Sequence, residues 1–264
     1  MTKNWRCLVL LIGIFAPLAA LLAWPPIAQD VRYHDFADTR SFFGIRHFFN
    51  VASNIAFLVV GALGLAGCLR QRPAGAAASW TVFFAGTALV AFGSAWYHLS
   101  PGNGTLVWDR LPMTVAFMAL FAGLVSEHMG EGLESVALPA AIMVGVGSIA
   151  WWYYADDLRM YAWVQFAPLL AIVLLLAVFP ARYSHRSYLA YGLAFYILSK
   201  LAESADSPIF AFTGGAISGH TLKHLLAALG PLWIHLMLRE REAVAQRTLK
   251  TSQRDVALDR GTRP

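Results

Sequence analysis

The stretch Ser79–His98 reads SWTVFFAGTALVAFGSAWYH, and it decides the fold. It contains no Asp, Glu, Lys or Arg, and about 20 such residues form a helix long enough to cross a bilayer. Ser94 and His98 nevertheless lie near its end, four residues apart and therefore on one helix face. Ionisable groups at membrane depth cost roughly 2.5–3.5 kcal/mol each on insertion scales, so they are rare and usually functional.

Similar apolar runs recur along the chain. Of its 264 residues, 58% are hydrophobic and 13% are charged, whereas soluble domains carry about 25% charged residues. Eight runs are predicted to be helices, because an open backbone in lipid would leave its polar groups unsatisfied. They cover residues 7–24, 45–69, 79–98, 110–128, 136–154, 161–180, 188–204 and 219–238. The predicted fold class is an all-α, polytopic membrane helix bundle with a seven-helix core and one N-terminal helix.

The N-terminal segment fits two interpretations, a retained anchor helix or a cleaved signal peptide. Pro17 interrupts the run and no A-x-A cleavage site precedes Asp30, so we favour the retained helix. The predicted division is 1–29 as anchor helix or signal segment, 30–240 as the seven-helix membrane domain and 241–264 as a charged cytosolic tail.

Charge alternates between the predicted loops. Basic residues mark one side: Lys3, Arg6, Arg70, Arg72, Arg182, Arg186, Arg239, Arg241, Arg247, Lys250 and Arg254. Acidic residues mark the other: Asp30, Asp35, Asp38, Asp156, Asp157, Glu203 and Asp206. The positive-inside rule then predicts that both termini are cytosolic. These flanks account for the net charge of +5 without a nucleic-acid partner, and the two cysteines, Cys7 and Cys68, do not suggest a disulfide framework.

The predicted topology brings distant polar residues to one depth. His98 ends a helix that runs outward, while Asp109 and His220 begin helices that run inward. All three are therefore expected at the outer side. The acidic stretch Asp30–Asp38 also precedes an inward helix and belongs to the same side.

Spacing favours a metal site among these residues. His220 and His224 are four residues apart, so both imidazoles point the same way. With His98 they would form the three-histidine site of catalytic zinc, which keeps one position open for water. Such water has a pKa near 7 and is a nucleophile at neutral pH. Asp109 could transfer its proton, and Ser94 could bind an oxyanion or orient a ligand.

Each residue also has a simpler explanation. His98 could be an interfacial side chain, Asp109 could pair with Arg110 at a helix start, and Ser94 could be a small packing residue. Five such residues at one depth favour the metal interpretation over these separate accounts. The role of Lys223 is left open.

The motifs resemble a known family. Ser94-x-x-x-His98, Trp108-Asp109-Arg110 and His220-x-x-x-His224 are similar to the pattern of the alkaline ceramidases and alkaline phytoceramidases. These belong to a superfamily of seven-helix membrane hydrolases that includes adiponectin-receptor-like and haemolysin-III-like proteins. The segment Asn50–Asn54 also resembles the ceramidase branch, and the likeness covers roughly residues 33–240.

The resemblance implies a zinc-dependent amidase that converts ceramide-like lipids to a sphingoid base and a fatty acid. It implies that His98, His220 and His224 bind zinc, that Asp109 transfers protons and that Ser94 assists the metal site or stabilises the tetrahedral intermediate. It also implies a calcium site in the acidic stretch. Asp35 and Asp38 match that stretch, but His47 stands near the place of an expected acidic ligand.

Three functions remain open at this point. The leading hypothesis is an intramembrane zinc amidohydrolase whose lipid substrate enters between helices near the outer face of a prokaryotic plasma membrane. The alternative is a seven-helix lipid sensor or receptor with a structural, closed zinc site. A transporter or channel is disfavoured, because few polar residues occupy the inner half. Acyl length and oligomeric state do not follow from the sequence.

Overall fold

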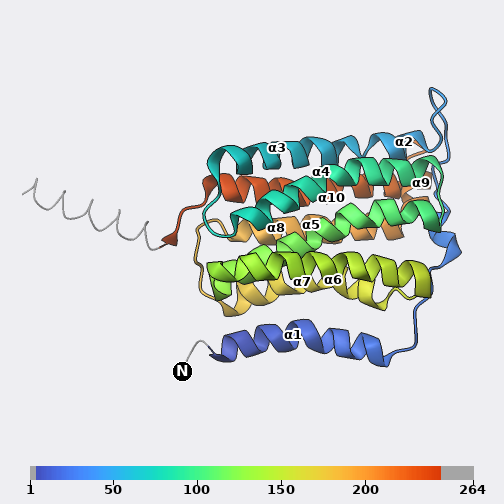
Figure 1. Cartoon of the computed structure of the whole chain (residues 1–264). Helices are drawn as coiled ribbons and strands as arrows, with labels where there is room; N and C mark the ends of the chain where they lie inside the picture. Colours follow the sequence, from blue (N-terminus) through green and yellow to red (C-terminus); the bar gives the residue numbers. More distant parts are fainter. Residues whose placement is uncertain (1–3, 245–264) are drawn as a thin grey trace, which may run out of the picture.

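The computed structural model describes residues 4–244, and their helices lie side by side in one bundle (Figure 1). Apart from α-helices, turns and loops, the described residues contain only two short 3-10 helices and two isolated β-bridges. The predicted all-α bundle is therefore confirmed. The α-helices are α1 (Asn4–Ala23), α2 (Phe48–Ala52), α3 (Ile55–Gln71), α4 (Ala77–Leu99), α5 (Asn103–Met129), α6 (Glu134–Ala155), α7 (Arg159–Val178), α8 (Ser187–Ser204), α9 (Asp206–Phe212) and α10 (Gly219–Glu240).

Within residues 4–244, seven spans are long and apolar enough to cross a membrane by length and composition alone. They contain α1, α2 with α3, α4, α5, α6, α7 and α10. The remaining predicted segment, 188–204, forms α8 (Ser187–Ser204), which runs along the bundle beside α10 (Figure 1). It includes Lys200 and Glu203 as well as several serines and tyrosines, and this polar content lowers its hydropathy below that of the other spans. The chain is an integral, multi-pass membrane protein.

Two predicted boundaries change. The segment 45–69 divides at Ser53 and Asn54 into the short helix α2 and the long helix α3. Helix α5 begins at Asn103, six residues before Asp109, because Asn103 and Gly104 are already helical. Asp109 was predicted to begin this helix, and it lies instead in the second turn.

Close helix contacts carry the candidate site residues towards each other. A Cβ atom on Gly93 of α4 would overlap the main-chain oxygen of Trp108 on α5. A Cβ atom on Gly219 of α10 would overlap the main-chain oxygen of Ala202 on α8. Glycine is required at both contacts. The two glycines immediately precede Ser94 and His220, so these close contacts fix the position of the main chain at both residues.

The C-terminal end of α4 and the N-terminal ends of α5 and α10 lie at the same end of the bundle (Figure 1). We call it the site end; it also carries α2, α9 and the connection from Trp24 to His47.

Helix α1 packs along α7 at the edge of the bundle (Figure 1). Trp163 of α7 donates a hydrogen bond from Nε1 to the main-chain oxygen of Ile14, at 2.8 Å. At the site end, Asp156 accepts from the main-chain nitrogen of Gln29 at 3.0 Å, and Arg159 donates to the main-chain oxygen of Leu22 at 3.0 Å. These bonds join the N-terminal segment to the core.

We predict that α1 is retained in the mature protein. Chain purified from a bacterial membrane should have an intact mass that includes residues 1–29, because hydrogen bonds at Ile14 and Leu22 join α1 to α7. Mass spectrometry of the intact chain measures this directly. A mature mass that begins near Asp30 would instead establish the signal-peptide interpretation.

The opposite end of the bundle contains a buried ion pair. Glu127 of α5 pairs with Arg241, which follows α10, at 2.6 Å, and both side chains are 3% exposed. The same carboxylate accepts from Nε1 of Trp80 at 2.7 Å. Nearby, Glu134 accepts from the main-chain nitrogen of Ser79 at 2.6 Å. Glu127 and Glu134, two acidic residues at the end of the bundle opposite the site end, therefore have structural partners.

We predict that Arg241→Leu lowers thermal stability strongly, by roughly 3–5 kcal/mol, because it leaves the Glu127 carboxylate buried without a cation. Arg239→Leu provides the matched control, since Arg239 is exposed in the last turn of α10, two residues before Arg241. Thermal unfolding in detergent compares the two variants. Equal melting temperatures would show that the buried pair contributes nothing.

Candidate metal centre

Three histidines meet at the site end. His98 comes from the last turn of α4, and His220 and His224 come from the first two turns of α10. One potential ligand atom from each lies within 4.8 Å of the others. The side chains are 1%, 4% and 2% exposed, respectively. Only a shared cation or other polar partners would satisfy three imidazoles that water barely reaches.

The unpaired nitrogens fit a metal. Nδ1 of His98 and Nε2 of His220 are buried and have no hydrogen-bond partner within the described chain. Buried polar atoms are nearly always paired, so such atoms require an explanation. Imidazole nitrogens are good zinc ligands, and the three-histidine set therefore fits zinc.

The partner of His224 determines its tautomer. The hydroxyl of Ser53 donates to the main-chain oxygen of Asn50 at 3.2 Å and lies 2.8 Å from Nδ1 of His224. Because the hydroxyl has one proton and gives it to Asn50, it accepts from Nδ1–H of His224. Nε2 then keeps its lone pair. A metal-binding histidine typically has such a partner on its other nitrogen, which raises its basicity.

Helix α2 supplies further support that the sequence did not reveal. His47 donates from Nδ1 to the main-chain oxygen of His98 at 2.9 Å. Asn50 accepts from the hydroxyl of Thr221 on α10 at 2.8 Å. The Asn50–Asn54 motif was informative only as a resemblance; its contacts now explain why these residue types stand there.

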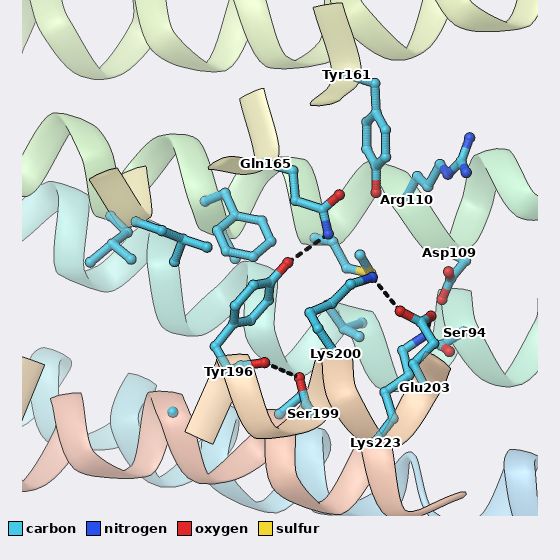
Figure 2. Close-up of a pocket in the computed structure, with 18 of the residues that line it drawn as sticks. Ser94, Asp109, Arg110, Tyr161, Gln165, Tyr196, Ser199, Lys200, Glu203 and Lys223 are labelled. Carbon is cyan, nitrogen blue, oxygen red and sulfur yellow. Dashed lines mark hydrogen bonds and ion pairs between the residues drawn. The ribbon is translucent and has the colours of Figure 1, made fainter. Parts of the chain in front are cut away.

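Ser94 and Asp109 lie beside the histidines in a cavity of about 470 Å³. Both side chains are buried, and Figure 2 shows them near each other at the cavity. His224 lines the same cavity and connects it with the histidine group. The wall beyond these polar residues is mostly apolar and includes Phe83, Phe117, Leu120, Leu169, Ile172 and Leu193.

Figure 2 shows Ser94, Asp109, Glu203 and Lys223 gathered on one side of this cavity. Lys223, whose role was open, forms an ion pair with Glu203. Lys200 binds the other oxygen of the same carboxylate. Sequence reasoning placed Glu203 in a loop and missed this cluster, because only α8 and α10 packing together brings its members into contact.

Asp109 and Arg110 have different surroundings despite being neighbours. Arg110 donates to Oε1 of Gln29 at 2.7 Å, and its guanidinium lies over the rings of Trp152 and Tyr161 at 4.2 and 4.5 Å. The simple Asp109–Arg110 ion pair considered from the sequence is thus not the arrangement observed.

The calcium site implied for Asp35 and Asp38 stays a prediction, and in the structure the Asp38 carboxylate already has a different cation. Asp38 is 1% exposed and its carboxylate pairs with Arg40 at 2.6 Å. Burial raises the pKa of Asp38, but the hydrogen bonds from Arg40 outweigh it and hold the pKa below its usual range. Among residues 4–244, the histidine trio is the one group of His, Cys, Asp and Glu that could hold a metal. Calcium takes six to eight oxygen ligands, whereas the Asp38 carboxylate here faces the Arg40 guanidinium.

The bundle and its buried histidine trio define a class: multi-pass membrane proteins with a candidate metal centre inside the helix bundle. A family model described as Ceramidase matches residues 44–206, which is more than half of the chain. The chain belongs to the ceramidase family, and this membership implies an amidohydrolase that acts on ceramide. The matched region contains Ser94, His98 and Asp109 but ends before His220 and His224. No curated protein matches the chain.

We predict that Ser53→Ala weakens zinc binding about 10–100-fold, because His224 loses the partner that fixes its tautomer. Ser204→Ala is the matched control, since its exposed hydroxyl bonds only to Leu201 within α8. Competition with a zinc chelator gives both dissociation constants. If Ser53→Ala binds zinc as tightly as Ser204→Ala, Ser53 does not support the metal.

Proposed function

We propose that this protein is a zinc-dependent amidohydrolase that cleaves the amide bond of ceramide-like lipids inside the membrane. The products are a sphingoid base and a fatty acid. The observation that carries the proposal is the buried trio of His98, His220 and His224 beside a long, mostly apolar cavity that also contains Asp109 and Ser94. Family membership supports the substrate class.

His98, His220 and His224 are the residues that would hold the zinc ion. When bound, zinc supplies a Lewis acid for the amide carbonyl and lowers the pKa of water towards 7. Asp109 accepts a proton from the attacking water and delivers it to the nitrogen of the leaving amine. Ser94 orients the Asp109 carboxylate or donates to the oxyanion of the tetrahedral intermediate.

The cavity suits the rest of the lipid. Its apolar wall would bind hydrocarbon chains, while its polar end would hold the amide and the hydroxyl groups next to it. Lys223 and Glu203 stand at that polar end. A hydroxyl or amine group of the substrate could form hydrogen bonds to Lys223 and Glu203, so this ion pair would help to recognise the polar part of the lipid.

Orientation completes the proposal. Arg70 lies in the last turn of α3, and Arg72 and Arg182 follow the ends of α3 and α7, all opposite the site end (Figure 1). By the positive-inside rule that opposite end faces the cytosol, and the scissile amide is cleaved near the outer face of the plasma membrane. In this proposal the substrate enters from the lipid, because residues of the spans α4, α5, α7 and α10 line the cavity.

We predict that Asp109→Asn lowers kcat for ceramide hydrolysis about 10²–10⁴-fold, because proton transfer is lost, while zinc content stays near one per chain. Release of fatty acid from ceramide, dihydroceramide and phytoceramide, together with elemental analysis, measures both quantities. Glu240→Gln is the control, a carboxylate-to-amide change at an exposed position on the opposite end.

His220→Ala should lose both zinc and hydrolysis. Wild-type protein that binds zinc but releases no fatty acid from any of the three lipids would overturn the hydrolase proposal and favour a sensor with a structural zinc site. Full activity in His220→Ala would remove the metal from the mechanism.

A further inference from the structure

One sequence pattern occurs three times at the site end. Asp30-Val-Arg32, Asp38-Thr-Arg40 and Asp157-Leu-Arg159 each place an arginine two residues after an aspartate. In each case the carboxylate accepts from both the main-chain nitrogen and the guanidinium of that arginine. The pairs differ in burial: Asp30 and Arg32 are exposed, whereas Asp38 is buried.

Arg40 binds Asp38 through two parallel hydrogen bonds, from Nε at 2.8 Å and from Nη2 at 2.6 Å. Nη2 also donates to the main-chain oxygen of Ala216 at 3.2 Å. The guanidinium lies over the rings of Phe49 and Phe210, at 4.7 and 5.2 Å from their centroids. One cation therefore joins the 35–40 segment to α2, to α9 and to the loop that leads into α10.

The segment held in this way covers the histidines. The ring of Phe36 contacts His98 and His220 edge to face, with centroid distances of 4.8 and 4.6 Å. The main-chain nitrogen of Ala37 donates to Asp206 at 2.9 Å, and the other carboxylate oxygen of Asp206 accepts from the main-chain nitrogen of His220 at 2.7 Å. The cap segment, residues 35–40, is thus tied directly to the start of the metal-binding helix.

A buried carboxylate requires a cation or several donors. The ceramidase resemblance implied calcium for this stretch, but the ligands present are a single buried carboxylate and a guanidinium. Arginine is always charged and binds a carboxylate through a fixed fork. Its presence does not depend on a free ion concentration, and repulsion from its charge opposes entry of a divalent cation.

We infer that Arg40 is a positioning residue whose guanidinium serves as a built-in cation, in place of calcium, and holds the cap segment over the three histidines. The inference builds on the proposed function, in which this trio binds zinc. It leads to two consequences: the protein needs no calcium, and loss of Arg40 uncovers the metal centre.

The first experiment measures the metal centre without using hydrolysis. A coloured chelator should remove zinc from Arg40→Ala at least about tenfold faster than from the wild type, because Phe36 no longer covers His98 and His220. Arg32→Ala is the matched control: it breaks the same type of pair in the same connection between α1 and α2, but an exposed pair outside the cap segment. Its half-time for zinc removal should match that of the wild type. Equal half-times in Arg40→Ala and Arg32→Ala would overturn the inference.

A second measurement separates positioning from general loss of folding. Guanidinium ion at about 10–50 mM should restore slow zinc release and at least part of the lost activity to Arg40→Ala, whereas the same concentration of sodium should not. Arg40→Lys keeps the charge but loses the fork, and should lie between the wild type and Arg40→Ala. Two results together would contradict a positioning role: guanidinium fails to slow zinc release from Arg40→Ala, and Arg40→Lys releases zinc as fast as Arg40→Ala.

Calcium itself provides the third test. Equilibrium dialysis of the wild type with calcium should detect no tight site, and hydrolysis should be unchanged within twofold after calcium depletion with zinc restored to one per chain. Stoichiometric calcium binding, or activity that returns only with calcium, would overturn the inference. If zinc release and calcium binding behave as expected while no lipid is cleaved, the inference holds and the proposed function fails.

Discussion

Three buried imidazoles in mutual contact are the constraint on which the rest of the site depends. Each ring has a nitrogen that water hardly reaches, and the rings of His98, His220 and His224 are about 5 Å apart. Without a metal, two of them keep unpaired nitrogens in the bundle. A zinc ion would satisfy them together, and its binding energy would offset the cost of burying so many polar groups.

The surrounding elements hold these rings at three levels. Gly93 lets α4 approach α5 closely, and Gly219 lets α10 approach α8, so the helices that carry the three histidines pack tightly. Ser53 and His47 fix the ring of His224 and the main chain at His98. Asp206 then links the start of α10 to the cap segment. The cavity adjoins the trio where Asp109 and Ser94 stand, so metal binding and proton transfer share one enclosed space.

The sequence predicted the parts of this arrangement that follow from span topology. Alternating spans place His98 and His220 at one end whatever the packing, and helical spacing places His224 beside His220. The partners that depend on loops and on helix contacts were missed. Nothing in the spacing indicates that Arg40 binds Asp38 or that Asp206 reaches both Ala37 and His220. The cluster of Lys200, Glu203 and Lys223 was missed because it requires α8 against α10. The catalytic roles of Ser94 and Asp109 stay predictions, and most of the predicted tail, 241–264, lies outside the described residues.

The central claim is that the histidine trio holds zinc in an open, three-ligand site. X-ray absorption at the zinc edge on purified protein tests it most directly. The account predicts about one zinc per chain, with three imidazole nitrogens at about 2.0–2.1 Å and a further light-atom ligand from solvent. Sulfur ligands, a shell closed by four protein ligands, or the lack of bound zinc would contradict it.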